Sequence, residues 1–316
     1  MIHIVPVHST SRIFNAAAVA AILALFSPLA VWAEEGTGAT GASFLMLPVG
    51  ARSIALGEAS AALAHDPFAW HSNPGLMPLV EGTGVGAFHS QWALDTYYDN
   101  AILKREMSDF VSIGCAITYL SSPDIAGYDE DGAPTASLSN NNLQGVLGVA
   151  IAPHPGLGIG VNAKYLQERI ADWTARGWAV DIGAAWRSGF HEITLGAAVQ
   201  NLGSDITFIT EKEKLPTAVR AGVSGAIPLV VAPVTLRLAA DIVKPRFEDP
   251  YACFGGEVDL QSMVFLRAGY TDDPSREGDR FSVGGGFALF GRLMLDYAWS
   301  PYGNLGSFHR ISLFVR

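Results

Sequence analysis

Side chains that could carry out chemistry are few and scattered in this sequence. The run from Gly222 to Ala226, GVSGA, places its second glycine one position too early for a nucleophile elbow. The sequence also contains no phosphate-binding loop, no His-Glu-x-x-His pair and no Cys-x-x-Cys pair. We therefore expect no catalytic residue, no cofactor and no enzymatic activity.

Acidic and histidine side chains do not form a metal-binding pattern either. Two acidic loops, 129–131 and 272–273, lack the ligand spacing of a calcium loop. His65, His71 and His89 are too scattered to suggest a ligand set. The sequence predicts solvated acidic loops and no metal site.

Isolated charges within stretches of apolar and small residues are better candidates for function. Seven of them are expected to face the lumen of a barrel: Lys164, Asp181, Arg237, Asp241, Glu257, Arg267 and Asp296. A charge at membrane depth is costly, so each should have a partner or water. Two interpretations remain open: ion pairs that hold the wall to an internal segment, or contacts with a substrate or protein cargo.

The composition narrows the class of protein. Charged residues make up 16% of the 316 residues, against about 25% in a typical soluble domain, while hydrophobic residues reach 49%. After residue 33 there is no run of 18 apolar residues, which excludes a helical membrane protein. The net charge of −10 argues against a nucleic-acid partner. With 34 glycines in no strict period and 10% aromatic residues, collagen and disorder are excluded as well.

The N-terminus is typical of an exported protein. Arg12 precedes an apolar stretch, 13–29, which ends before the small-residue site at Ala33. This pattern predicts a signal peptide over 1–33 and cleavage before Glu34. A membrane anchor is the alternative, although the apolar stretch is at the short limit for spanning.

From Gly82 onward the sequence alternates between apolar and small or polar residues, the period of β-strands. Fourteen strands are predicted: 82–90, 96–105, 109–120, 142–152, 156–167, 176–188, 190–201, 217–227, 233–242, 252–260, 262–271, 280–289, 291–300 and 307–316. The connections are predicted to alternate strictly between longer and shorter, as in transmembrane barrels. We therefore expect an all-β fold, an antiparallel barrel over 81–316 in the bacterial outer membrane, surrounded by lipid. A soluble β-sandwich is the alternative.

Four side chains test this register. Trp178 and Trp186 share a face eight residues apart, a spacing that could put one indole at each lipid interface. Cys115 is expected on the lipid face and Cys253 in the lumen, so the two thiols should stay free.

The segment 34–80 differs from the barrel sequence. It begins with a glycine-rich leader, followed by an alanine-rich stretch, 51–64, that predicts a short helix, and by a turn signature at 72–75. Because it is short and rich in small residues, we do not expect it to fold alone. We expect it to pack inside or under the barrel as a short helical plug.

Both ends of the predicted mature chain resemble the PorV/PorQ family, relatives of the FadL-like β-barrels. The N-terminal likeness lies in FLMLPVGARSIALGEA at 44–59, AHD at 64–66 and NPGL at 73–76. The C-terminal likeness is LDYAWSPYGNLGSFHRISL at 295–313. Within the N-terminal motif the residues of the plug are Gly50, Arg52, Gly57, Asp66, Asn73, Pro74 and Gly75.

The resemblance implies one of two functions on one fold. A PorV-type protein takes part in type IX secretion, with secreted cargo proteins or secretion-system subunits as partners. A FadL-like protein is a passive channel for hydrophobic small molecules, which requires a lateral gap in the wall and an apolar pocket beside the plug.

Overall fold

The computed structural model describes residues 40–316 except 129–130, 209–210, 230–232, 277–278 and 304–305. The predicted signal peptide, 1–33, and the start of the predicted leader, 34–39, lie outside the described residues. Within the described part of the chain, no helix is long and apolar enough to cross a bilayer.

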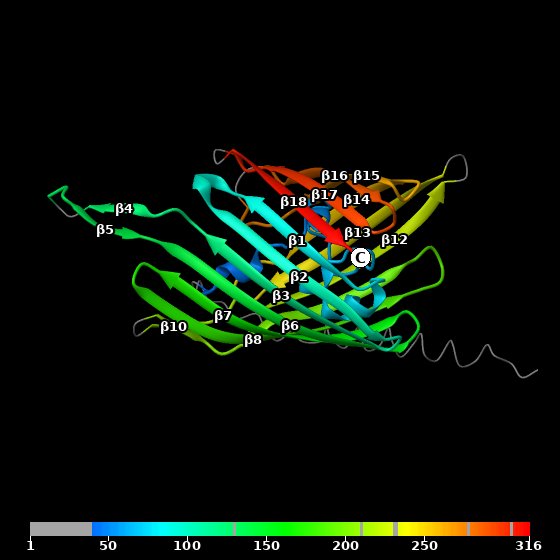
Figure 1. The fold of residues 1–316 in the computed structure, drawn as a ribbon, viewed down its shortest axis with the longest axis horizontal. Helices are drawn as coiled ribbons and strands as arrows, with labels where there is room; N and C mark the ends of the chain where they lie inside the picture. Colours follow the sequence, from blue (N-terminus) through cyan, green and yellow to red (C-terminus); the bar gives the residue numbers. More distant parts are fainter. Residues whose placement is uncertain (1–39, 129–130, 209–210, 230–232, 277–278, 304–305) are drawn as a thin grey trace, which may run out of the picture.

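Fourteen antiparallel strands close into one barrel, so the predicted fold class is confirmed and the sandwich alternative is wrong (Figure 1). Neighbouring strands pair around the barrel, and β1 pairs with β18 to close it. Closure satisfies the backbone hydrogen bonds of strands that would otherwise form edges in lipid. The strands are β1 (Gly84–Gln91), β2 (Tyr97–Ser108), β3 (Val111–Ser121), β6 (Asn140–His154), β7 (Leu157–Ile170), β8 (Trp173–Arg187), β9 (Thr194–Gly203), β12 (Ala218–Leu229), β13 (Val234–Pro245), β14 (Tyr251–Leu260), β15 (Val264–Thr271), β16 (Phe281–Leu289), β17 (Leu293–Pro301) and β18 (Ser307–Val315).

Alternation along each strand separates the two faces of the wall. In β7, Asn162 and Lys164 are buried in the interior, while Ile159 and Val161 face outward and are each 39% exposed. Large apolar side chains cover the outer surface in the same way on the other strands, as Leu147 and Ile242 illustrate. A polar interior within an apolar outer surface is the arrangement that a lipid surrounding requires.

Two of the long connections contain hairpins of their own. The strands β4 (Ile125–Tyr128) and β5 (Pro134–Leu138) pair and project from one end of the barrel (Figure 1), and β10 (Ile206–Phe208) pairs with β11 (Glu211–Glu213). The expected strict alternation of connection lengths fails at β8. Its connection to β7 is only 171–172, whereas the connection to β9 spans 188–193. The predicted loop 168–175 instead continues the β7–β8 ladder, because charged residues are tolerated where a hairpin extends into water.

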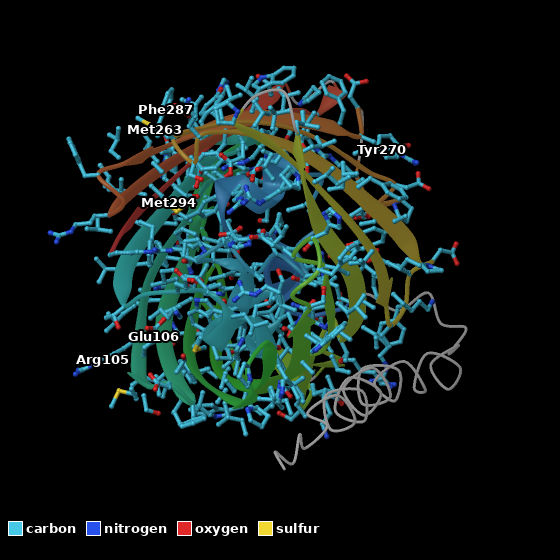
Figure 2. The ribbon with its side chains drawn as sticks, turned by 90° about the vertical axis from the view of Figure 1, so that its right-hand side faces the viewer. Arg105, Glu106, Met263, Tyr270, Phe287 and Met294 are labelled. Carbon is cyan, nitrogen blue, oxygen red and sulfur yellow. The ribbon has the colours of Figure 1, made fainter. Side chains whose placement is uncertain are left out.

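Residues 41–80, here called the internal segment, lie inside the barrel and are mostly buried (Figure 2). The predicted helix over 51–64 is much shorter: α2 spans Ala51–Ala55, flanked by the 3-10 helices η2 (Ser43–Met46), η3 (Ala69–His71) and η4 (Pro74–Leu79). The chain turns sharply at Gly57 and Glu58, whose φ angles are +66° and +70°. Two residues in the left-handed conformation cannot continue an α-helix. The prediction from alanine content alone therefore made the helix too long.

The internal segment contacts the wall through backbone, which requires small residues on the strands. A Cβ added at Gly269 would lie 1.9 Å from the amide nitrogen of Gly57, and one added at Gly196 would lie 1.9 Å from the carbonyl oxygen of Ala61. Both positions face inward. The glycine-rich strands thus provide space for a second layer of chain within the barrel.

The four register residues lie as follows. Cys115 is exposed on the outer face, Cys253 is buried, and both thiols are free. Trp178 faces outward and is 65% exposed. Trp186, near the end of β8 that leads into 188–193, is half-buried because it packs over the small side chains of a cluster that contains Ala184.

We predict that Gly269→Ala destabilises the barrel by about 1–3 kcal/mol, because the new methyl group overlaps the backbone of the internal segment. The measurement is the temperature at which the compact, heat-modifiable gel band disappears. Gly256→Ala on the adjacent strand is the control, since its nearest neighbour would be 3.7 Å away. Equal unfolding temperatures for the two variants would contradict the close contact.

Candidate functional site

A buried ion cluster joins the internal segment to the wall. The Arg52 guanidinium donates two hydrogen bonds to Glu257, at 3.0 Å from Nε and 2.7 Å from Nη2. Arg267 donates to the same carboxylate at 2.6 Å and to Asp296 at 2.6 Å. Two arginines and two carboxylates therefore neutralise one another where water is excluded, which is the condition under which buried charges are tolerated.

A second cluster forms around Asp241. Its carboxylate accepts hydrogen bonds from the backbone amides of Ser60 and Ala61, both at 2.8 Å, and from Arg220 at 3.1 Å. Arg220 also donates to the carbonyl oxygen of Glu58 at 2.6 Å. Again one wall carboxylate and one wall arginine hold the backbone of the internal segment.

The third cluster lies at a β-bulge between β8 and β9. Lys164 forms an ion pair with Asp181 at 2.8 Å and donates to the side chain of Asn201 at 2.8 Å. Asn201 has a φ of +58°, and its amide donates to Asp181 at 2.8 Å. The bulge therefore turns one backbone amide toward the buried carboxylate.

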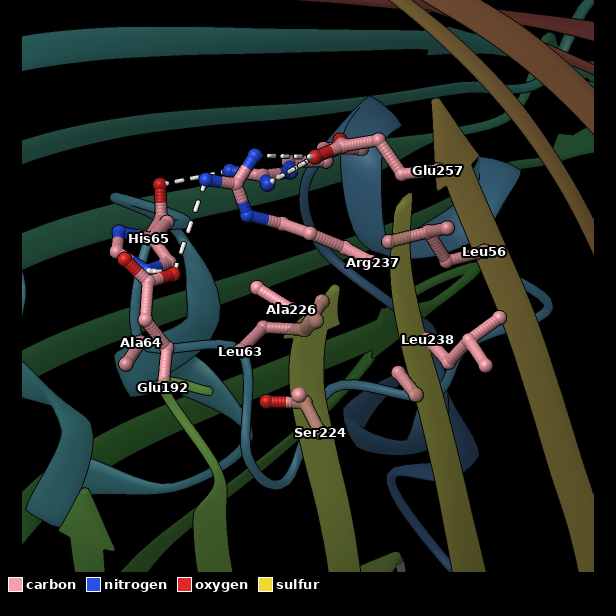
Figure 3. Close-up of a pocket in the computed structure, with 13 residues that line it drawn as sticks. Leu56, Leu63, Ala64, His65, Glu192, Ser224, Ala226, Arg237, Leu238 and Glu257 are labelled. Atoms are coloured by element: carbon pink, nitrogen blue, oxygen red, sulfur yellow. Dashed lines mark hydrogen bonds and ion pairs between the residues drawn. The ribbon is translucent and has the colours of Figure 1, made fainter. Parts of the chain in front are cut away.

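Arg237 is the most exposed of the seven predicted charges, and it lines a small pocket with His65 and Glu192 (Figure 3). It pairs with Asp259 and lies 3.8 Å from Glu192. Partial desolvation, and then the Arg52 guanidinium, lower the pKa of His65 to about 4, although its side chain is 40% exposed. His65 is therefore neutral at pH 7, and its 3.1 Å contact with Glu192 is a hydrogen bond. The pocket has about 20 Å³ of free space, enough for one water molecule.

All seven predicted charges thus face the interior, and each has an oppositely charged partner. Sequence reasoning missed several of the interior charges, although the same alternation along the strands would have found them. The missed residues are Lys104, Arg220, Asp259 and Arg310.

The residues of the predicted plug motif position the backbone of the internal segment. Asn73 caps η4 by accepting from the amide of Gly75 at 3.0 Å, and its amide group donates to the carbonyl oxygens of Ala61 and Ala184. Pro74 is the first residue of η4. The left-handed Gly50, at φ +98°, precedes α2. Gly75 lies against the wall, where a Cβ would approach the Cα of Ala184 to 2.6 Å.

A larger cavity of about 590 Å³ lies at the long-loop end, between η2 and the connections that follow β9, β13, β15 and β17. Apolar side chains from the internal segment and the wall line it, among them Phe44, Leu47, Leu120 and Tyr302. Its polar lining includes Glu58 and Arg276. No cluster of metal-ligating side chains occurs within the described ranges.

The described wall shows no lateral gap. Strand pairing continues around the barrel, with register shifts only at three places, in the pairs β2–β3, β6–β7 and β8–β9. On the outer face, however, an apolar groove of about 690 Å³ crosses β12 to β15 over small residues such as Gly225 and Gly256. The small inner pocket reaches the same stretch of wall at Ser224 and Ala239.

Asp66 in the internal segment makes stability depend on pH. Burial raises the pKa of Asp66 to about 6, although the Arg52 guanidinium opposes the shift. Because this pKa lies above its unfolded value, the folded state binds more protons, and stability falls as pH rises from about 4 to about 6.

We predict that Asp66→Asn removes this pH-dependent loss of stability, which is about 3 kcal/mol at most. The test compares heat-unfolding temperatures of both proteins from pH 4 to pH 7. A constant difference across that range would contradict the prediction.

Comparison with known proteins gives similarity at the level of structure. No family model matches the sequence, and no curated protein does so either. The toluene transporter TodX of Pseudomonas putida superposes with a TM-score of 0.58 and 12% identity, covering 89% of this chain and 97% of that one. The toluene transporter TbuX of Ralstonia pickettii gives 0.58 and 12%, covering 84% and 96%. A FadL homologue of Pseudomonas aeruginosa gives 0.52 and 11%, covering 85% and 98%.

These similarities agree with the strand order and with the apolar outer surface, which suit the expected location in the bacterial outer membrane. They do not single out the PorV/PorQ family. The chain has the fold of the FadL-like outer-membrane channels.

Proposed function

We propose that the protein is a passive channel that admits small hydrophobic molecules at its long-loop end. The observation that carries this proposal is the cavity of about 590 Å³ between the internal segment and the mouth of the barrel. Its volume suits a small organic molecule, and its lining combines aromatic and aliphatic side chains with polar and charged ones. The similar solved structures include transporters of toluene, which supports the same class of substrate.

The secretion role that the PorV/PorQ resemblance implies has no comparable support. The described interior is largely filled by the internal segment and its ion clusters, and the solved structures named above are hydrocarbon transporters and a FadL homologue. A hydrophobic small molecule therefore accounts for the cavity better than a protein cargo does.

We place the exit from the barrel at the wall formed by β12 and β13. There the inner pocket and the outer groove lie on opposite faces of the same strands and share Ser224, Gly225 and Ala239. The ladder is complete at this point, so passage requires these strands to part transiently. Three residues shared by the pocket and the groove are small, so little side-chain volume separates the two spaces at this point.

Filling the cavity at the long-loop end, here called the external cavity, should block entry. We predict that Leu120→Trp lowers uptake of toluene into proteoliposomes about tenfold, because Leu120 faces the cavity from β3. The control is Ile117→Trp on the same strand, since Ile117 faces outward and is 54% exposed. Toluene entry no faster than into protein-free liposomes would contradict the channel function itself.

Cross-linking the proposed exit should block release. Ser224 and Ala239 lie directly opposite each other on β12 and β13, so Ser224→Cys and Ala239→Cys can form a disulfide in a background with Cys115→Ser and Cys253→Ser. We predict severalfold slower uptake in the oxidised protein and recovery on reduction.

The matched control is Ile117→Cys with Gly145→Cys, an opposed pair on β3 and β6. Oxidation of this pair should leave uptake unchanged. If the oxidised Ser224/Ala239 pair transports as fast as its reduced form, the exit lies elsewhere in the wall.

A further inference from the structure

One buried guanidinium faces the external cavity without a hydrogen-bond partner among the residues that the structure describes. The side chain of Arg276, in the connection between β15 and β16, is only 3% exposed. Within the described ranges none of its three guanidinium nitrogens makes a hydrogen bond. Among the described residues, it forms an ion pair with Glu58, whose carboxylate oxygen lies 3.8 Å from Nη1 and is too far away for a hydrogen bond. A desolvated guanidinium of this kind favours an additional anion.

Aromatic side chains lie beside this arginine. The guanidinium carbon of Arg276 is 4.7 Å from the ring centroid of Tyr302. Tyr302 and Trp92 line the same cavity, with ring centroids 6.3 Å apart. Phe44 and Phe247 add two further aromatic surfaces to the lining. Flat apolar rings next to a cation suit a flat ligand with a negatively charged end.

The other charged groups that face the cavity are engaged elsewhere or meet water. Glu168 accepts a hydrogen bond from the amide of Ala42 at 2.8 Å, and Asp273 accepts from Ser275. Glu248 is exposed, and Arg246 lies over the ring of Phe247. These carboxylates oppose ligands with several negative charges. Arg276 therefore suits a single anionic group that reaches past them.

We propose that the external cavity binds a compact aromatic carboxylate, with the carboxylate on Arg276 and the ring against Tyr302 and Trp92. The proposal rests on the channel function and specifies its substrate class. A bidentate carboxylate would take over from Glu58 as the partner of the guanidinium. A neutral hydrocarbon would leave the guanidinium without a hydrogen-bonded anion.

Binding to the purified full-length chain in detergent tests the proposal. Isothermal titration compares cinnamate with cinnamyl alcohol, which has the same ring and no charge. We expect cinnamate to bind at least tenfold more tightly. Arg276→Gln should abolish that preference, and Arg276→Lys should keep part of it. Glu58→Gln should strengthen cinnamate binding, because it removes the competing carboxylate.

The matched control is Arg280→Gln, the same change in the same connection at an exposed arginine that pairs with Asp272. It should keep the preference for cinnamate. Heat-modifiable gel mobility shows that each variant is folded.

Three outcomes would overturn the proposal. The first is equal affinity of the protein for cinnamate and cinnamyl alcohol. The second is a folded Arg276→Gln variant that keeps the preference for cinnamate. The third is tighter binding of hexadecanoate than of cinnamate to the unmodified protein. Toluene uptake in proteoliposomes separates this inference from the channel function. If uptake persists while the carboxylate preference is absent, only the substrate class is wrong, whereas loss of both refutes the channel.

Discussion

The ion cluster of Arg52, Glu257, Arg267 and Asp296 is the interaction on which the barrel interior depends. A closed wall satisfies its backbone in lipid but leaves inward charges that must be neutralised away from water. Here the internal segment supplies Arg52, and the wall supplies the other three groups. The segment therefore neutralises negative charge on the inner face of the wall as well as filling the space inside it.

Close backbone contact accompanies this charge pairing. Inward glycines such as Gly269 and Gly196 admit the chain of the internal segment to positions where any larger side chain would collide. Asp241 then holds the same segment through two backbone amides. Because these contacts are distributed along the segment, its ejection as a unit would break the Arg52–Glu257 ion pair and several buried hydrogen bonds at once.

Two spaces beside the filled centre differ in size. The external cavity of about 590 Å³ can hold an organic molecule, while the pocket beside His65 and Arg237 has room for one water. The outer groove on β12 to β15 lies across a thin stretch of wall from that pocket. Under the proposed channel function, binding would take place at the loops and release at β12 and β13, on the other side of the internal segment.

The sequence by itself determined the strands and the faces of their side chains, because a period of two is a local property of the wall. Lys164, Asp181 and Glu257 could be placed in the interior on that basis, and Cys115 on the outer face. Only the tertiary structure decided which charges meet, since Arg52 and Glu257 are 205 residues apart. It also shortened the expected helix to Ala51–Ala55, extended the β7–β8 hairpin, and left Arg276 facing the cavity. Those outcomes depend on contacts between distant segments, which no local pattern records.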